Sequence, residues 1–291
     1  MFVAGEIAIK LLGEADKIEV YLRNKSNTAK DMGAEDELEE AAGGKEALYE
    51  QQKGTLNELT EKMMIGTFDQ KKNVMKEPFN MLGGFLPICL ETCKRIYADV
   101  KSDSVRVKSS TLTRVTMQTL CKFMAVSPTL LEEEINYLFW LILPLVDPVI
   151  KNNVIISIGD LVHKHNHIIE QHSVKLYSCL KDKDANVRRT TFLVLAHLIL
   201  NSALKIREEL PDLVHMLFDE QEDIRTYAKL FFSEFHNNSK NTIANLLPGA
   251  ISRLSMSAEN GGVREEMFQK FARELLQYID KDGMTSGLVD K

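Results

Sequence analysis

The chain has 291 residues, of which 44% are hydrophobic and 27% are charged, and its formal net charge is −6. The charge is uneven, because residues 1–80 hold 16 acidic and 11 basic side chains whereas residues 81–291 hold 26 and 25. A nearly neutral body of mixed sign disfavours an autonomous nucleic-acid-binding protein, which is typically basic.

The apolar pattern argues against a membrane protein. The longest apolar run, residues 138–146, contains Pro144 and is far shorter than the roughly 20 residues that a spanning helix needs. No signal peptide is visible. The four cysteines show no paired framework, which predicts a reducing intracellular compartment.

The N-terminal part divides into three segments. Residues 1–23 read as a helix that begins without a cap, so we expect an internal fragment or a partial gene model of a longer protein. Residues 24–57 hold almost no bulky apolar side chains and several acidic ones, which predicts a disordered acidic insertion. Residues 58–80 are expected to form a helical lead-in to the segment that follows.

Residues 81–291 carry a repeat with a period of 37 residues. Three pairs stand at this spacing and each opens a helical apolar pattern: Ile150-Lys151, Val187-Arg188 and Ile224-Arg225. Two helices per unit at this period indicate an α-solenoid of HEAT type, in which each unit buries its apolar face against its neighbours. The predicted fold class is therefore all-α.

Prolines mark two helix starts within this segment. Ser127-Pro128 and Asp147-Pro148 each place an N-cap residue before a proline at the first helical position. One column of the repeat is small in all three units: Gly159, Ala196 and Ser233. We expect this column to lie at the tightest contact between neighbouring helices.

Basic residues recur where the second helix of each unit begins. Their column is Arg106, Lys151, Arg188, Arg225 and Arg264, and in two units an aspartate precedes the arginine by six residues, Asp182 and Asp219. Because helix N-termini favour anions, these side chains are candidates for phosphate contacts. The favoured alternative is an intramolecular ladder, in which each basic residue pairs with an acidic residue of its own or the next repeat.

Arg189 lies one position beyond this column and has no equivalent of its charge in the other repeats. We expect it to face outward, as a candidate contact for DNA or an acidic partner. Ser127 belongs to the chain's one Ser/Thr-Pro dipeptide and is a candidate phosphosite, although the N-cap role is favoured.

No metal, cofactor or catalytic constellation is predicted. His163, His165 and His167 lack a supporting carboxylate or thiol, and we expect them at a solvated helix end. Cys89 and Cys93, one helical turn apart, are expected to be core residues.

Several stretches resemble the condensin subunit 1 family, the HEAT-repeat non-SMC subunits of condensin. The stretches that carry the likeness are LYSCLKDKDANVRRTTFLVLAHLIL at 176–200, NVIISIGDLV at 153–162, LCKFMAVS at 120–127 and NLLPGAISRLS at 245–255. The last of these favours condensin I over the condensin II paralogue.

This resemblance implies a structural and regulatory scaffold in mitotic chromosome condensation, acting in the nucleus and on chromosomes, and in the cytoplasm for part of the cell cycle. Its implied partners are a kleisin, the SMC ATPase subunits and chromosomal DNA, the DNA bound weakly and without sequence preference. ATP hydrolysis belongs to the SMC subunits, so no enzyme activity, small-molecule substrate or cofactor is expected here. The repeat alone also permits a generic HEAT adaptor for transport or phosphatase scaffolding.

Overall fold

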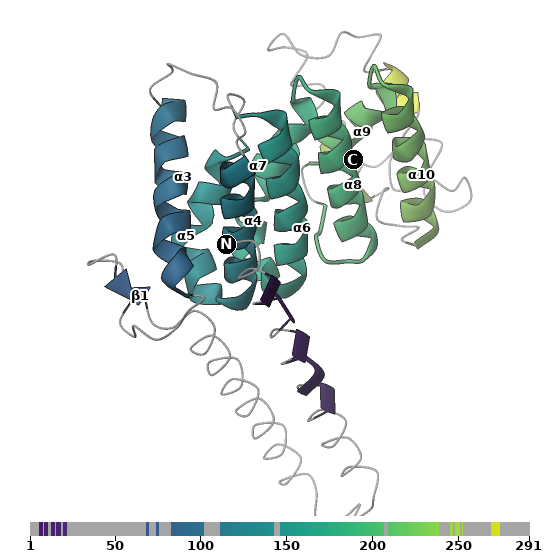
Figure 1. Cartoon of the computed structure of the whole chain (residues 1–291). Helices are drawn as coiled ribbons and strands as arrows, with labels where there is room; N and C mark the ends of the chain where they lie inside the picture. The colour runs from purple at the N-terminus through teal and green to yellow at the C-terminus, as the bar shows by residue number, and fades with distance from the viewer. Residues whose placement is uncertain are drawn as a thin grey trace, which may run out of the picture. The chain divides into compact units, whose positions relative to one another are not determined.

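The structure is a computed structural model that describes residues 83–101, 111–142, 146–206 and 209–238. It also describes shorter helical stretches between residues 6 and 21 and between 245 and 273, and the pairs 68–69 and 74–75. These residues fall into two compact units, Met1–Leu141 and Ile142–Lys291 (Figure 1). Apart from one two-residue strand pair, the regular structure described is helical, in agreement with the predicted all-α class.

The N-terminal predictions have different outcomes. The described residues between 6 and 21 are all helical, whereas the predicted insertion at 24–57 lies outside the described residues. Within residues 58–80, strand β1 (Phe68–Asp69) pairs antiparallel with β2 (Val74–Met75), which differs from the helix expected there. Phe68 and Val74 are residue types that favour extended backbone, so the local sequence does not favour a helix at these positions.

Three helices form the core of the first unit. A 3-10 turn, η1 (Gly83–Phe85), leads into α3 (Leu86–Lys101), which is followed by α4 (Thr111–Val126) and α5 (Pro128–Trp140). Helix α3 contacts both α4 and α5. Its buried residues recur every three or four positions, the pattern of one helical face: Leu86, Cys89, Leu90, Cys93 and Ile96.

Sulfur and aromatic side chains join these helices. The Cys93 thiol lies 3.7 Å from the Met117 sulfur of α4, and the Tyr97 ring stacks on Trp140 of α5 at a centroid distance of 3.7 Å. Burial raises the pKa of the Cys89 thiol to about 12, so this thiol stays protonated and packs as an apolar group. Cys89 and Cys93 are thus core residues, as predicted.

The second unit alternates long and short helices. It contains α6 (Pro148–Glu170), α7 (Ser173–Ser178) with η2 (Cys179–Lys181), α8 (Ala185–Leu200), α9 (Leu210–His215) with η3 (Met216–Phe218), and α10 (Glu222–Asn238). Helix α8 contacts both α6 and α10, while η2 packs on α8 and η3 packs on α10. Helices α5 and α6 begin at the prolines that the sequence predicted.

The repeat columns separate into buried and exposed sets. Ile150, Val187 and Ile224 are at most 1% exposed, so the three long helices present the same face to the core. The column of Ile158, Leu195 and Phe232 is fully buried. The apolar column of Ile156, Leu193 and Leu230 is instead 49%, 41% and 62% exposed.

The small column marks a close contact at Gly159. A Cβ atom added to Gly159 of α6 would lie 2.8 Å from a methyl group of Val194 on α8. Ala196 is buried, but Ser233 of α10 is exposed. The tight approach therefore lies between α6 and α8.

We expect Gly159→Ala to destabilise the second unit or leave its stability unchanged, although alanine normally favours a helix over glycine by about 1 kcal/mol. The new methyl group collides with Val194, which offsets the helix preference. In a Val194→Ala background the same substitution should stabilise, as measured by urea denaturation. Gly249→Ala is the matched control, because nothing lies within 4 Å of its added Cβ. A stabilising Gly159→Ala in the otherwise unchanged chain would contradict this contact.

Candidate functional site

The turn between the two helices of a repeat is built around an aspartate. Asp182 follows η2, and its Oδ1 accepts a hydrogen bond of 2.9 Å from the amide of Asp184. Asp219 follows η3, and its Oδ1 accepts from the amide of Gln221 at the same distance. Aspartate suits this position because its short carboxylate reaches the backbone two residues ahead. The two turns thus repeat in geometry as well as in sequence.

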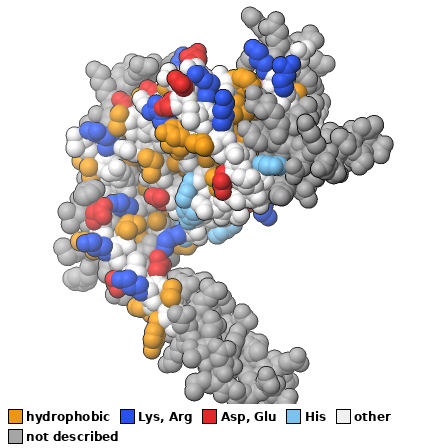
Figure 2. Space-filling model, turned by 90° about the vertical axis from the view of Figure 1, so that its right-hand side faces the viewer, with side chains coloured by type: hydrophobic (Ala, Val, Ile, Leu, Met, Phe, Trp, Pro, Cys, Tyr) orange, Lys and Arg blue, Asp and Glu red, His pale blue; other side chains and the backbone are white. Residues whose placement is uncertain are grey.

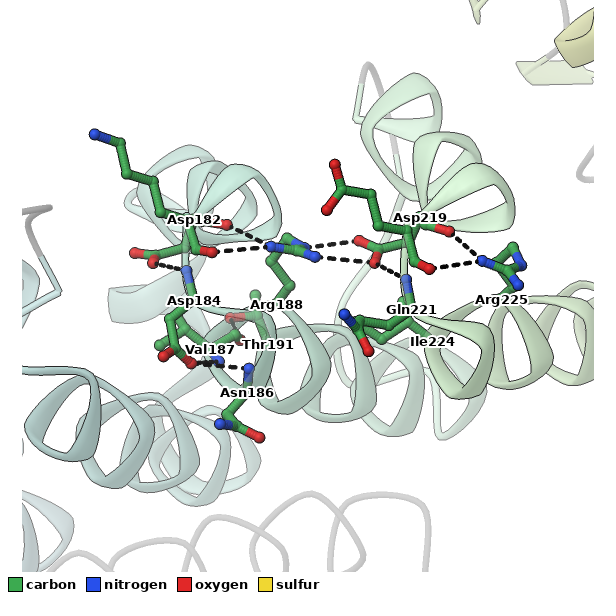
Figure 3. Close-up of polar contacts among 12 residues, drawn as sticks. Asp182, Asp184, Asn186, Val187, Arg188, Thr191, Asp219, Gln221, Ile224 and Arg225 are labelled. Carbon is green, nitrogen blue, oxygen red and sulfur yellow. Dashed lines mark hydrogen bonds and ion pairs between the residues drawn. The ribbon is translucent and has the colours of Figure 1, made fainter.

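In both repeats, an arginine near the start of the second helix donates hydrogen bonds to backbone carbonyls of the interhelical turn. Arg188 Nη1 donates to the carbonyl oxygens of Asp182 and Lys183 at 3.0 and 3.3 Å (Figure 3). Arg225 Nη1 donates to those of Asp219 and Glu220 at 2.6 and 3.0 Å. The six-residue spacing from aspartate to arginine therefore satisfies backbone carbonyls, and the two side chains of one repeat form no direct ion pair.

The carboxylates of Asp182 and Asp219 pair instead with basic side chains of the preceding repeat. Lys151 Nζ of α6 lies 2.5 Å from Asp182 Oδ2. Arg188 of α8 forms a two-pronged pair with Asp219, with Nε 2.7 Å from Oδ2 and Nη2 3.0 Å from Oδ1 (Figure 3). Both partners are 31 residues ahead in the chain. Of the two ladders that the sequence allowed, the described pairs follow the one that joins each repeat to the next.

Burial and hydrogen bonding set the charge state of the second pair. The Arg188 and Asp219 side chains are only 13% and 4% exposed. Burial alone would raise the pKa of the Asp219 carboxyl, but hydrogen bonds from Arg188 and from the Gln221 amide outweigh it and hold the pKa below its usual range. The hydrogen bond to Asp219 correspondingly raises the pKa of Arg188. Both groups are therefore charged at neutral pH.

The rest of the basic column is only partly described. Arg106 and Arg264 lie outside the described residues. Within the described part of the chain, Arg225 contacts the backbone of its own turn and no carboxylate. The structure thus assembles the column over three successive long helices, with charged pairs between the first and second repeats and between the second and third.

Arg189 departs from its predicted setting. Its Nη2 lies 2.5 Å from Asp223 Oδ2 on α10, and its Nη1 donates to Asn186 Oδ1 at 3.0 Å. Arg189 was expected to face outward and to be available for DNA or an acidic partner, but the packing of α8 beside α10 brings the first turn of α10 within its reach. The pair is 34% and 40% exposed, so Arg189 remains partly accessible to solvent. Nothing in the repeat pattern pointed to Asp223, since the aligned positions of the other repeats are Asn186 and Val149.

Ser127 forms the cap that the sequence favoured. Its Oγ accepts a hydrogen bond of 3.1 Å from the Leu130 amide at the start of α5. The residue is 2% exposed. A kinase would have to open the start of α5 to reach this hydroxyl, so the phosphosite remains an expectation that the folded geometry disfavours.

The histidine cluster lies at a break between two helical segments, close to the helix end that was expected, and His163 and His167 are exposed. Helix α6 continues to Glu170, with a kink at His165, whose φ and ψ are −132° and 48°. The ring of His163 lies beside that of His197 of α8, at a centroid distance of 5.5 Å.

Within the described ranges, no group of three or more His, Cys, Asp or Glu side chains is arranged to hold a metal. No helix described is long and apolar enough to cross a membrane.

We expect Arg188→Ala to lower the free energy of unfolding by about 3–5 kcal/mol, because it leaves the Asp219 carboxylate buried and unpaired. Arg189→Ala is the matched control, and loss of its half-exposed pair should cost less than about 1 kcal/mol. Asp219→Asn keeps an oxygen for the Gln221 amide, so Arg188→Ala/Asp219→Asn should cost less than the sum of the two single changes. Equal losses for Arg188→Ala and Arg189→Ala in urea denaturation would contradict the assignment.

The same pair predicts a pH dependence. Because the pKa of Asp219 is lowered by folding, its stabilising effect is present above the unfolded pKa of about 4 and is lost as pH falls through the folded value. The stability difference between the unmodified chain and Asp219→Asn should therefore shrink below about pH 4. A difference that stays constant down to pH 2 would show that the carboxylate charge is not involved.

Comparison with known proteins finds a family whose model covers the residues of this ladder. Residues 149–291 match the family model of the non-SMC mitotic condensation complex subunit 1. This match contains Lys151, Arg188 and Arg225 together with the two aspartates of the turns.

Curated relatives extend the likeness over more of the chain. Condensin complex subunit 1 of Xenopus laevis is 33% identical over 72% of the chain, and that of Mus musculus is 28% identical over 99%. The subunit from Schizosaccharomyces pombe is 27% identical over the whole chain. The chain spans 15%, 20% and 24% of the lengths of these three relatives. The family model and the relatives agree, and the chain belongs to the condensin complex subunit 1 family.

Proposed function

We propose that the chain serves as a structural scaffold within a condensin complex and carries no catalytic activity of its own. The observation that carries this proposal is the match to condensin complex subunit 1 from vertebrates and a fission yeast. The proposed partners are a kleisin and the SMC ATPase subunits, with chromosomal DNA close by. The proposed location is the nucleus and the chromosomes, with residence in the cytoplasm for part of the cell cycle.

The second unit has the physical properties that a scaffold requires. Buried ion pairs fix α6 and α8 to the turn of the next repeat. A charged pair of this kind demands defined geometry, because each misplaced charge would remain buried without its partner. The helices therefore hold a constant register while their outward-facing side chains remain available for contacts.

Two alternatives lead to different partners. A condensin II subunit would associate with the kleisin and SMC proteins of condensin II. A generic HEAT adaptor would associate with transport receptors or phosphatase subunits and with no SMC protein. The sequence similarity to condensin complex subunit 1 favours condensin, and the NLLPGAISRLS stretch at 245–255 favours condensin I.

We expect the tagged chain, expressed in dividing cells of its own source, to co-purify with SMC ATPases and the condensin I kleisin. Mass spectrometry of the captured proteins identifies them. Arg188→Ala should reduce this capture in proportion to its loss of folded protein, whereas Val174→Ala, at a 65% exposed site on α7, should leave capture unchanged. Recovery of transport or phosphatase subunits without any SMC protein would refute the proposal, and recovery of the condensin II kleisin would reassign the complex.

Weak DNA binding through Arg189 is the finer part of the proposal. The surface in Figure 2 carries acidic and basic side chains side by side, so few phosphates can be neutralised at once. With one or two phosphate contacts, affinity should fall only about 4- to 12-fold between 50 and 200 mM salt. Nanomolar, sequence-specific binding by this chain would contradict the expectation.

The Arg189–Asp223 pair provides a sharper test of this contact. Asp223→Asn releases the guanidinium from its carboxylate and should strengthen DNA binding, while Arg189→Gln should weaken it. Both substitutions are close in size to the original side chains, and both should leave the melting temperature nearly unchanged. Fluorescence anisotropy with a labelled duplex measures the affinities. If the two substitutions shift affinity in the same direction, Arg189 does not contact DNA.

A further inference from the structure

The exposed apolar column forms a continuous row across three helices. Ile156, Leu193 and Leu230 occupy equivalent positions of α6, α8 and α10 and are 49%, 41% and 62% exposed. The buried residues Ile150, Val187 and Ile224 show that the three helices share one rotational setting. Because α8 contacts α6 and α10, the three apolar side chains lie in a row that we call the apolar stripe.

The elements that pack against α8 do not cover this row. Helix α8 has α6 on one side and α10 on the other, and η2 and α7 of its own repeat also pack against it. Leu193 lies on the side that none of these elements covers. An exposed apolar row that recurs with the repeat is therefore a surface feature of the folded unit.

One edge of the stripe carries an acidic residue at each of its two ends. One helical turn beyond each apolar residue lie Asp160, His197 and Glu234, all exposed. In the described part of the chain, no lysine or arginine pairs with Asp160 or Glu234. Partial burial raises the pKa of Asp160, and the charges of His163 and His197 oppose that rise. On the opposite edge, Arg189 is already engaged by Asp223.

The spacing of the stripe selects a peptide conformation. Packed helices lie about 8–10 Å apart. A polyproline II segment rises about 3.1 Å per residue and returns to the same face every third residue, so side chains at i, i+3 and i+6 are about 9 Å apart. A β-strand presents the same face every second residue, about 7 Å apart, and falls out of step with the helices. The polyproline II repeat therefore matches the helix spacing.

We propose that the apolar stripe of Ile156, Leu193 and Leu230 binds an extended partner segment in the polyproline II conformation, with an apolar residue at every third position and basic residues beside Asp160 and Glu234. The apolar side chains of the segment would lie over successive long helices. Its lysines or arginines would face the acidic edge, and its backbone groups remain accessible to water, as this conformation requires.

The test uses the full chain and synthetic fluorescent peptides of 9–10 residues. One peptide carries leucine at every third position with arginine between, and the second has the same composition with leucine at every second position. We expect the first peptide to bind at least 10-fold more tightly in fluorescence anisotropy. Leu193→Asp should weaken its binding about 10-fold or more, because a buried leucine contact is replaced by a charge.

Val174→Asp is the matched control, since it introduces the same charge at an exposed apolar site on α7 and should change binding less than 2-fold. Asp160→Asn/Glu234→Gln should reduce the preference for arginine over glutamine in the peptide. Circular dichroism and the melting temperature confirm that each variant is folded.

Four results would overturn the proposal. They are equal binding of the two peptides, equal loss for Leu193→Asp and Val174→Asp, preferential binding of an amphipathic helical peptide, and concentration-dependent dimerisation abolished by Leu193→Asp. The assay contains no condensin component, so its outcome is independent of membership in that complex.

Discussion

The second unit depends on the guanidinium of Arg188, which serves two turns at once. One of its nitrogens satisfies the carbonyl oxygens of its own turn, while two others hold the Asp219 carboxylate of the next repeat. The Asp219 carboxylate also accepts a hydrogen bond from the Gln221 amide of its own turn. Backbone groups of both turns are thereby given hydrogen-bond partners, and α8 is fixed in register with α10.

Hydrophobic packing alone therefore does not set the register between neighbouring helices of the repeat. Apolar columns such as Ile158, Leu195 and Phe232 supply non-directional burial, which tolerates small rotations of a helix. A two-pronged ion pair does not tolerate them, since each nitrogen must meet its own oxygen. The charged pairs fix the register of the helices, and the apolar columns stabilise the fold. A protein that holds partners in a fixed arrangement needs both.

The neighbouring arginines show how one residue step changes a side chain's role. Arg188 is buried and linked to two turns, whereas Arg189 makes a half-exposed pair with Asp223. The first pair resists exchange with an outside ligand, because its charges would lose their buried partner. The second exchanges more readily, since water already reaches both groups. Contacts with partners are therefore expected at the rim of the ladder, and its centre is structural.

The sequence alone determined the period, the all-α class, the helix starts at Pro128 and Pro148 and the basic column, because these depend on local spacing and on residues near one another in the chain. It did not determine which aspartate each basic residue meets. Asp182 and Asp219 stand six residues before an arginine, yet each pairs with a basic residue 31 positions earlier. The partner of Arg189 and the exposure of Leu193 also depend on how the helices stack. Helix periodicity fixes which residues share a face, but only the packing of neighbouring helices decides which face is covered and which charges meet across it.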